Sequence, residues 1–194
     1  INLEDCKFHQ REKFNSNFVT IISSDVPMKN LKTVIKALYL LKQEGFNANL
    51  TIIGDLRESN KKLIDQLGLA DEIVYRPKLP RKKLIETLNI SDIGIAPSSY
   101  EGFGFPLIEM IATGLPMIVS NKASLPELAG NAGLIFKSED SIDLKEKMKE
   151  LIDNKILRKK LIKNSKLRRD DFFGWDEYAK KLEDLYKEII SGNI

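Results

Sequence analysis

Short apolar runs alternate with amphipathic segments along most of this chain, and that alternation restricts the fold more than any other feature. Residues 18–22 form the first apolar run. Residues 30–42 follow, with apolar side chains at every third or fourth position, which is the spacing of one helix face. Short apolar strands joined by helices are typical of βαβ units. The sequence therefore predicts one α/β domain with a doubly wound, mostly parallel, Rossmann-like sheet of about six strands.

The other predicted elements fit the same scheme, and beyond residue 143 the pattern is helical only. Strands are expected at 49–53, 72–75, 92–97, 117–119 and 134–136, and helices at 61–67, 84–88, from 106 onward, and at 144–153, 155–169 and 175–190.

The predicted helix at 155–169 carries eight Lys and Arg residues. We favour the ordinary explanation, a solvated basic face on a packed helix. The functional alternative is attraction to an anionic membrane surface or to a lipid-linked phosphate acceptor.

The composition excludes several classes of protein. A chain of 194 residues with 42% hydrophobic and 30% charged residues can bury the core of one globular domain. Its net charge of +3 is too small to indicate a nucleic-acid partner. Cys6 and His9 are the only cysteine and the only histidine, which excludes an internal disulfide, a Ser-His-Asp triad and a multi-histidine metal site. No apolar run reaches the roughly 18 to 20 residues that cross a bilayer.

Two glutamates, Glu101 and Glu109, stand eight residues apart around a glycine-rich turn that leads into a predicted helix. Pro106 suits the first helical position, because proline has no amide hydrogen to leave unpaired there. Phe105, just before it, has no side-chain oxygen to cap the amides of 107–109, so these amides and the helix dipole predict an anion site. A glutamate in the first turn can accept hydroxyls beside that site, as a nucleotide sugar requires. The ordinary alternative is one solvated glutamate and one that only offsets the dipole.

The sequence around these glutamates resembles a known family. The residues between them, GFGFPLI, and the segments 112–120, 125–128 and 131–135 are similar to the Glu-x7-Glu region of the retaining family 4 glycosyltransferases. The tail at 175–186 resembles that family's closing helix, so the resemblance covers nearly the whole chain. It implies the GT-B arrangement, in which two α/β domains face each other across a cleft. This chain resembles the C-terminal, donor-binding half.

The resemblance also implies how the chain is divided. Residues 1–17 would be an interdomain lead-in, and residues 18–194 the nucleotide-sugar-binding domain. The N-terminal acceptor domain is absent from this chain, and the final helix would reach back toward it. The chain begins with Ile1 rather than methionine, so we expect a piece of a longer protein or a processed product.

In an open parallel sheet the ligand lies outside the carboxyl ends of the strands. Loops are expected to converge there at 23–29, 54–58, 76–80 and 98–105. The resemblance implies that Lys29 contacts the donor diphosphate and is catalytic, and that Leu107 and Ile108 face the same diphosphate. It also implies that the loop with Lys78 and Leu79 reads the edge of the base.

The transferred sugar and the ribose are assigned, by the same resemblance, to the segment between the two glutamates. The catalytic Glu101, with Phe103, Gly104 and Phe105, would bind the transferred sugar, and Glu109 would accept the ribose hydroxyls. As the glycosidic bond breaks, charge develops on the departing diphosphate, and a lysine with a helix N-terminus can stabilise it. Neither a metal nor a cofactor is therefore expected, since the nucleotide sugar is a substrate.

Two segments depart from the family pattern. Ser23 and Ser24 occupy positions where the family usually has Gly-Arg, and the bidentate fork of arginine cannot be replaced by serine. Either the diphosphate is bound differently or this member transfers slowly. Residues 54–57 read Gly-Asp-Leu-Arg rather than the usual Gly-Asp-Gly turn.

The sequence thus predicts the donor-binding domain of a retaining glycosyltransferase. It would move a sugar from a nucleotide diphosphate sugar, with a UDP-sugar favoured, to a saccharide or lipid-linked acceptor. By analogy we expect a role in bacterial surface-polysaccharide synthesis (O-antigen, capsule or lipopolysaccharide), in the cytoplasm at the cytosolic face of the inner membrane, with peripheral contact to anionic lipid.

Three alternatives stand beside this prediction. A non-catalytic nucleotide-sugar-binding module and a sugar-nucleotide epimerase of the same fold would share the donor pocket. A dinucleotide-dependent oxidoreductase is disfavoured, because Gly102 and Gly104 are followed by Leu107 where a third glycine should stand.

Overall fold

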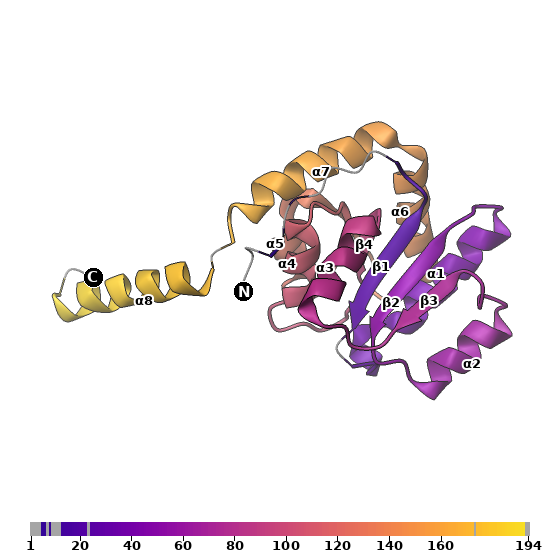
Figure 1. The fold of residues 1–194 in the computed structure, drawn as a ribbon, viewed down its shortest axis with the longest axis horizontal. Helices are drawn as coiled ribbons and strands as arrows, with labels where there is room; N and C mark the ends of the chain where they lie inside the picture. Colours follow the sequence, from indigo (N-terminus) through magenta and orange to yellow (C-terminus); the bar gives the residue numbers. More distant parts are fainter. Residues whose placement is uncertain (1–4, 7, 9–12, 23, 173, 193–194) are drawn as a thin grey trace.

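The computed structural model describes residues 5, 6, 8, 13–22, 24–172 and 174–192, so His9 and Ser23 lie outside the described residues. Its centre is a six-stranded sheet in the order β3-β2-β1-β4-β5-β6, with every neighbouring pair parallel (Figure 1). The predicted α/β fold is confirmed. The strands are β1 (Asn17–Ile22), β2 (Asn49–Gly54), β3 (Ile73–Arg76), β4 (Ile93–Ala96), β5 (Met117–Ser120) and β6 (Gly133–Phe136).

Helices connect the strands in the predicted order. Three short elements were not predicted, α5, η1 and η2, because three to five residues are too few to show a helical period. The helices are α1 (Leu31–Gln43), α2 (Glu58–Gln66), α3 (Arg81–Ile90), α4 (Phe105–Ala112), α5 (Leu125–Ala129), α6 (Ser141–Asp153), α7 (Lys155–Arg169) and α8 (Trp175–Ile190), with 3₁₀ turns η1 (Pro27–Lys29) and η2 (Gly130–Ala132).

The sheet divides the core into two layers. Phe18 of β1 belongs to the layer that includes side chains of α1, α2 and α6. Val19, the next residue, belongs to the layer that includes side chains of α3, α4 and α5. Both residues are fully buried, as expected for a strand covered on both faces. Because the strand order reverses between β1 and β4, the loops after these two strands flank the crevice in which such sheets bind ligands.

Helix α7 packs against α4 and α6, and part of its basic character has a structural use. Arg158 donates to the carbonyls of Leu151 and Ile152 at 2.5 and 2.6 Å. Arg168 donates to the carbonyls of Leu128 and Glu127 at 2.9 and 2.7 Å. These contacts favour the packed-helix explanation, and attraction to anionic lipid stays a prediction.

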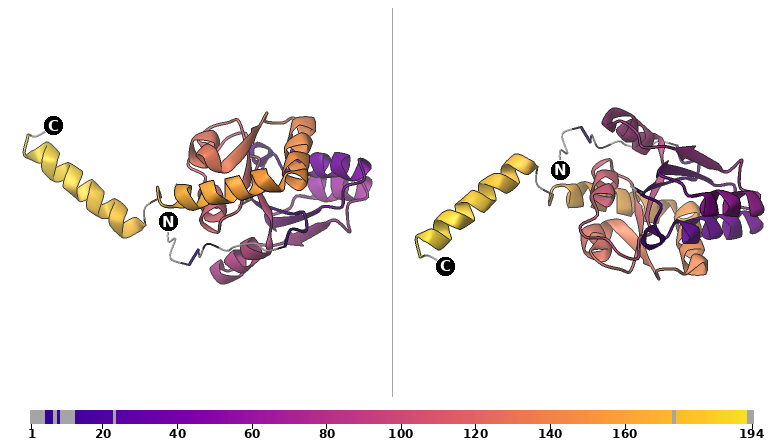
Figure 2. Two further views of the ribbon diagram at one scale, coloured as in Figure 1. Left: turned by 90° about the horizontal axis from the view of Figure 1, so that it is seen from above. Right: turned by 90° about the horizontal axis from the view of Figure 1, so that it is seen from below.

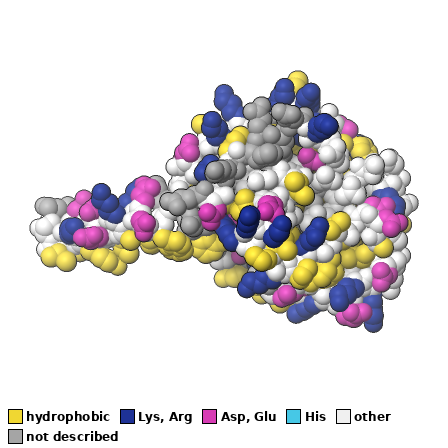
Figure 3. Space-filling model, in the orientation of Figure 1, with side chains coloured by type: hydrophobic (Ala, Val, Ile, Leu, Met, Phe, Trp, Pro, Cys, Tyr) yellow, Lys and Arg dark blue, Asp and Glu magenta, His cyan; other side chains and the backbone are white. Residues whose placement is uncertain are grey.

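Helix α8 extends away from the rest of the domain (Figures 1 and 2), and none of its residues is buried. Hydrophobic side chains gather along one side of it (Figure 3). Tyr178, Leu185, Tyr186 and Ile189 are exposed large hydrophobic residues of this helix. None of the described helices is both long enough and apolar enough to cross a bilayer.

Candidate functional site

The loops after β1 and β4 are joined where the strand order reverses. Asn30, between η1 and α1, has a left-handed backbone with φ of 54°, which asparagine tolerates better than most residues. Its side-chain amide donates to the carbonyl of Pro97 at 3.0 Å. The amide of Ser99 donates to the carbonyl of Met28 at 2.7 Å. We call these two bonds the inter-loop latch, because they attach the residues on either side of Lys29 to the segment after β4.

Lys29 and Glu101, the two predicted catalytic residues, form an ion pair across these loops. The Lys29 Nζ and the Glu101 Oε2 are 2.6 Å apart, and the two side chains are 14% and 17% exposed. A lysine ammonium supplies three donors and a carboxylate only acceptors. Neighbouring positions in the crevice therefore offer opposite chemistry, one suited to a phosphate and the other to a hydroxyl.

Helix α4 begins one residue earlier than predicted. Phe105 is its first residue, and Gly104 precedes it with φ of 99° and no side-chain cap. The carbonyl of Gly104 accepts hydrogen bonds from the amides of Leu107 and Ile108 at 2.9 and 3.3 Å. The expectation that these two amides are unpaired is therefore wrong, because the carbonyl of a helix-capping residue already accepts the first bonds of the helix. An anion at this helix end would have to meet the amides before them, at 104–105.

Glu109 lies in the second turn of α4 and not in the first as predicted. Its side chain is 15% exposed and accepts a hydrogen bond from Nη1 of Arg81, the first residue of α3. Burial raises the pKa of the Glu109 carboxyl, and the nearby Arg81 guanidinium opposes that rise. The carboxylate is thus connected to the helix that follows the predicted base-reading loop.

A family comparison agrees with this geometry. The family model described as "Glycosyl transferases group 1" matches residues 4–168. The chain belongs to the group 1 glycosyl transferases. Their GT-B fold, expected from the sequence, is confirmed by the structural neighbours.

Individual relatives cover much of this group 1 chain. The MMP alpha-(1->4)-mannosyltransferase of Mycolicibacterium hassiacum is 30% identical over 110 residues, which are 55% of this chain and 26% of the relative. Sucrose-phosphate synthase from Thermosynechococcus elongatus aligns with a TM-score of 0.83 at 19% identity, over 99% of this chain and 51% of that one. The pneumococcal O-GlcNAc transferase GtfA, in complex with UDP and GlcNAc, aligns with a TM-score of 0.77 at 18% identity, over 95% and 38%. The chain thus spans about half or less of each of these proteins.

The predicted base-reading residues of this glycosyltransferase chain lie apart from the Lys29–Glu101 pair. Leu79 packs partly buried against the core layer of α3 and α4, and Lys78 is exposed. Within the described residues, no hydrogen bond or ion pair joins either of them to Lys29 or Glu101. Their link to the site runs through the start of α3, where Arg81 contacts Glu109.

The predicted sugar-binding loop presents aromatic rings on an open surface. Phe103 and Phe105 are 48% and 43% exposed, with ring centroids 5.1 Å apart. Phe105 also lies 6.3 Å from the Trp175 ring, and these rings line an apolar hollow of about 430 Å³. Beside Glu101 and Gly104 the enclosed space is only about 20 Å³. A sugar at this loop would therefore lie on the surface and not in a closed pocket.

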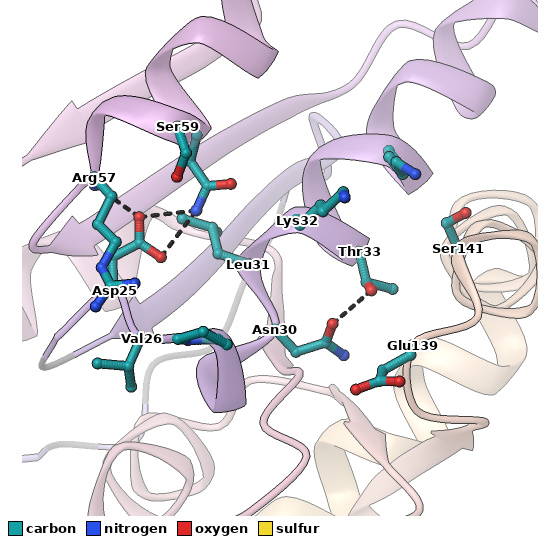
Figure 4. A pocket seen from close by; sticks show the side chains of 13 residues that line it. Asp25, Val26, Asn30, Leu31, Lys32, Thr33, Arg57, Ser59, Glu139 and Ser141 are labelled. Carbon is teal, nitrogen blue, oxygen red and sulfur yellow. Dashed lines mark hydrogen bonds between the residues drawn. The ribbon is translucent and has the colours of Figure 1, made fainter.

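A polar hollow of about 440 Å³ lies between α1 and the starts of α2 and α6 (Figure 4). Asp25, 5% exposed, accepts hydrogen bonds there from the amide of Arg57 at 2.7 Å and the side chain of Asn60 at 2.8 Å. These bonds fix the unusual 54–57 segment to the loop after β1. Ser24, which precedes Asp25, remains the position where the family's arginine is absent.

Three structurally important residues were not identified from the sequence: Asp25, Asn30 and Arg81. Asp25 and Asn30 could have been found, since Asp and Asn are frequent where a loop must turn or cap a helix. Arg81 stands first in an Arg-Lys-Lys run, and nothing in the sequence distinguishes it from its neighbours. Among the described residues, no group of three or more His, Cys, Asp or Glu side chains is arranged to hold a metal ion.

Proposed function

We propose that this chain is the nucleotide-sugar-binding domain of a retaining glycosyltransferase. The observation that carries the proposal is the Lys29–Glu101 ion pair, between the loops of β1 and β4 where the strand order reverses. Open parallel sheets bind ligands at this position. A cation beside a carboxylate suits a ligand in which a phosphate adjoins a hydroxylated ring.

In this proposal, the bound donor separates Lys29 from Glu101. Lys29 contacts the diphosphate, and Glu101 accepts hydroxyls of the transferred sugar. The bond between the anomeric carbon and the diphosphate oxygen breaks, so negative charge develops on the diphosphate. Lys29 and the start of α4, near Gly104 and Phe105, stabilise that charge without a metal ion.

The donor we propose is a UDP-sugar. GtfA, a protein of the same fold, was solved with UDP. A UDP-sugar also offers a diphosphate to the Lys29 ammonium and sugar hydroxyls to the Glu101 carboxylate. Glu109 would accept the ribose hydroxyls, and the loop with Lys78 and Leu79 would contact the base.

The acceptor we propose is a saccharide or a lipid-linked saccharide, bound by a separate N-terminal domain. The apolar side of α8 suits packing against that domain, since none of its residues is buried in this chain. We place the enzyme in bacterial surface-polysaccharide synthesis at the cytosolic face of the inner membrane, with the basic residues of α7 near anionic lipid.

Binding measurements on the 194-residue chain test the donor site. We expect Glu109→Ala to weaken UDP about ten- to a hundredfold, since a hydrogen bond to a charged group contributes about 1.5–3 kcal/mol. Glu101→Ala should spare UDP but weaken UDP-glucose, because only the latter carries a sugar. Glu58→Ala, which removes a glutamate that is 70% exposed, is the matched control. If both site variants bind both ligands like the parent, the two carboxylates are structural.

A non-catalytic nucleotide-sugar-binding module is the second candidate, favoured by Ser24 at the position of the family's arginine. Sugar transfer by the full-length protein, from UDP-glucose to a supplied saccharide, separates the two candidates. The 194-residue chain alone should bind the donor without transferring sugar. Steady transfer by this chain would contradict the assignment of the acceptor to another domain.

A further inference from the structure

Arg81 connects three parts of the chain at the predicted ribose site. It is the first residue of α3 and directly follows the loop predicted to read the base. Its Nη1 donates to Oε1 of Glu109 on α4. Its Nη2 lies 3.2 Å from the Cys6 Sγ, and its Nε lies 4.0 Å from an Asp5 carboxylate oxygen. The guanidinium is therefore held from several sides, with Nη1 directed at the Glu109 carboxylate and Nη2 at the Cys6 sulfur.

Glu109 depends on this contact, because its surroundings disfavour a charged carboxylate. Its side chain is 15% exposed, and burial is the largest influence on its pKa, which is raised. Arg81 is the group that opposes this rise. Among the residues that the structure describes, the other charged or titratable groups of this cluster are Cys6, Asp5 and Arg169, and burial also raises the pKa of the Cys6 thiol.

We propose that Arg81 is a positioning residue of the ribose site: it aims the Glu109 carboxylate and keeps it charged so that it can accept the hydroxyls of a nucleoside diphosphate. The inference rests on the proposed function, since it assigns ribose binding to Glu109. Arg81 occupies Oε1, and a carboxylate has about four acceptor sites over two oxygens, so ribose hydroxyls can be accepted at the same time. The same contact joins α4 to the start of α3, which directly follows the base-reading loop. It therefore also sets the distance between the base contacts and the ribose contacts.

A purely structural, partly buried ion pair is the alternative explanation. The two explanations differ in pH dependence. If Arg81 keeps Glu109 charged, its removal raises the carboxyl pKa. The hydroxyl contacts are then lost at a higher pH as the solution is acidified, and they return as the pH is raised. A structural pair predicts no such change.

The test compares UDP with 2′,3′-dideoxy-UDP by calorimetry on the 194-residue chain, between about pH 5 and pH 8, the range above an ordinary carboxyl pKa. The two ligands share the base and the diphosphate, so titration of the phosphate cancels in the ratio of their affinities. That ratio isolates the hydroxyl contacts. The variants are Arg81→Gln, Arg81→Lys and Glu109→Gln, with Lys82→Gln as a control that removes an exposed cation from the same helix.

We expect the parent ratio to fall on acidification, by about tenfold for each unit below the Glu109 pKa until the preference is gone. Arg81→Gln should move this fall upward by about one to three pH units, because a neighbouring arginine lowers a carboxyl pKa by about that much. Arg81→Lys keeps the charge and should stay close to the parent. Glu109→Gln keeps an acceptor oxygen but cannot titrate, so its ratio should be lower than that of the parent and the same at every pH. Lys82→Gln should change nothing.

The inference would be overturned if the affinity ratio of Arg81→Gln fell at the same pH as that of the parent. It would also be overturned if Arg81→Gln weakened the binding of both nucleotides equally. A pH-dependent ratio in Glu109→Gln would overturn it as well, since the titrating group would then lie elsewhere. If Arg81→Gln does not fold, as judged by circular dichroism, Arg81→Met takes its place: it also removes the charge but keeps a long apolar side chain, and it must show the same upward shift. Failure of the proposed function looks different: the parent binds neither nucleotide at any pH, and the inference falls with it.

Discussion

Two ion pairs involve carboxylates near the start of α4: Glu101 precedes this helix in the sequence, and Glu109 lies within it. The two pairs differ in the elements that supply them and in the role that we propose for each. Lys29 and Glu101 come from two loops and meet at 2.6 Å in the crevice of the sheet. Arg81 and Glu109 come from two helices, and the arginine also contacts Cys6. In the proposed function both members of the first pair bind the donor, so the pair opens on binding. Only Glu109 of the second pair binds the donor, so that pair stays closed.

This difference explains why some residues of the site could be predicted from the sequence and others could not. In the proposed function Glu101 and Glu109 contact the ligand, so the ligand sets their spacing across the glycine-rich turn. A supporting residue such as Arg81 needs only to reach its partner in space, and many positions of a helix start would serve.

Breaking the first pair at its cation should have the largest effect. Lys29→Ala should weaken UDP about tenfold or more, since it removes a charge-assisted hydrogen bond and leaves Glu101 to repel the diphosphate. Uridine, which has no diphosphate, should be almost unaffected. The loss should shrink at high salt, because charges are screened over about 10 Å at 0.1 M. Lys32→Ala, which removes an exposed lysine of α1, is the control. Equal losses for UDP and uridine would mean that Lys29 does not contact phosphate.

Much of the fold followed from the sequence because strands and helices have distinct periods. Each of the six strands was expected close to its observed position, and so were the helices of eight or more residues. The start of α4 was placed one residue too late, because Pro106 suggested the first position, whereas Phe105 is the first residue and the left-handed Gly104 is the residue that caps it. That single-residue error also produced the wrong statement about unpaired amides at Leu107 and Ile108.

The parts of the site that could not be predicted depend on contacts between distant segments. The bond from Asn30 to Pro97 spans 67 positions, and the Arg81 contact to Glu109 spans 28. Local patterns carry no information on such distances. The hydrogen bond from the Arg57 amide to Asp25 likewise joins distant segments. Their two loops were expected to converge, but the bond itself could not be predicted.

Loosening the inter-loop latch should have an intermediate effect. Asn30→Ala removes the donor to Pro97 and places alanine in a left-handed conformation, so the free energy of unfolding should fall by about 1–2 kcal/mol. The UDP affinity should fall by about two- to tenfold, because Lys29 is no longer held opposite Glu101. Asn30→Gly, which tolerates the backbone conformation, separates the two effects: it should retain more stability and still lose affinity. Urea unfolding and UDP titration give both quantities, and an unchanged UDP affinity in both variants would show that the latch does not position Lys29.

Adding a cation near the first pair should have the smallest effect on UDP affinity, and it should raise this affinity. Ser24 lies in the loop after β1, where its carbonyl accepts the amide of Val26 at 2.9 Å, so a longer side chain there leaves that turn intact. Ser24→Arg supplies a bidentate donor that serine lacks, but on a partly exposed loop such a contact contributes about 0.2–1 kcal/mol. UDP should therefore bind about two- to fivefold more tightly at low salt, with little gain at high salt and none for uridine. Ser24→Gln, which adds a shorter and neutral hydrogen-bonding side chain, should show no gain. Tightening of uridine and UDP alike would mean that the new side chain contacts the nucleoside.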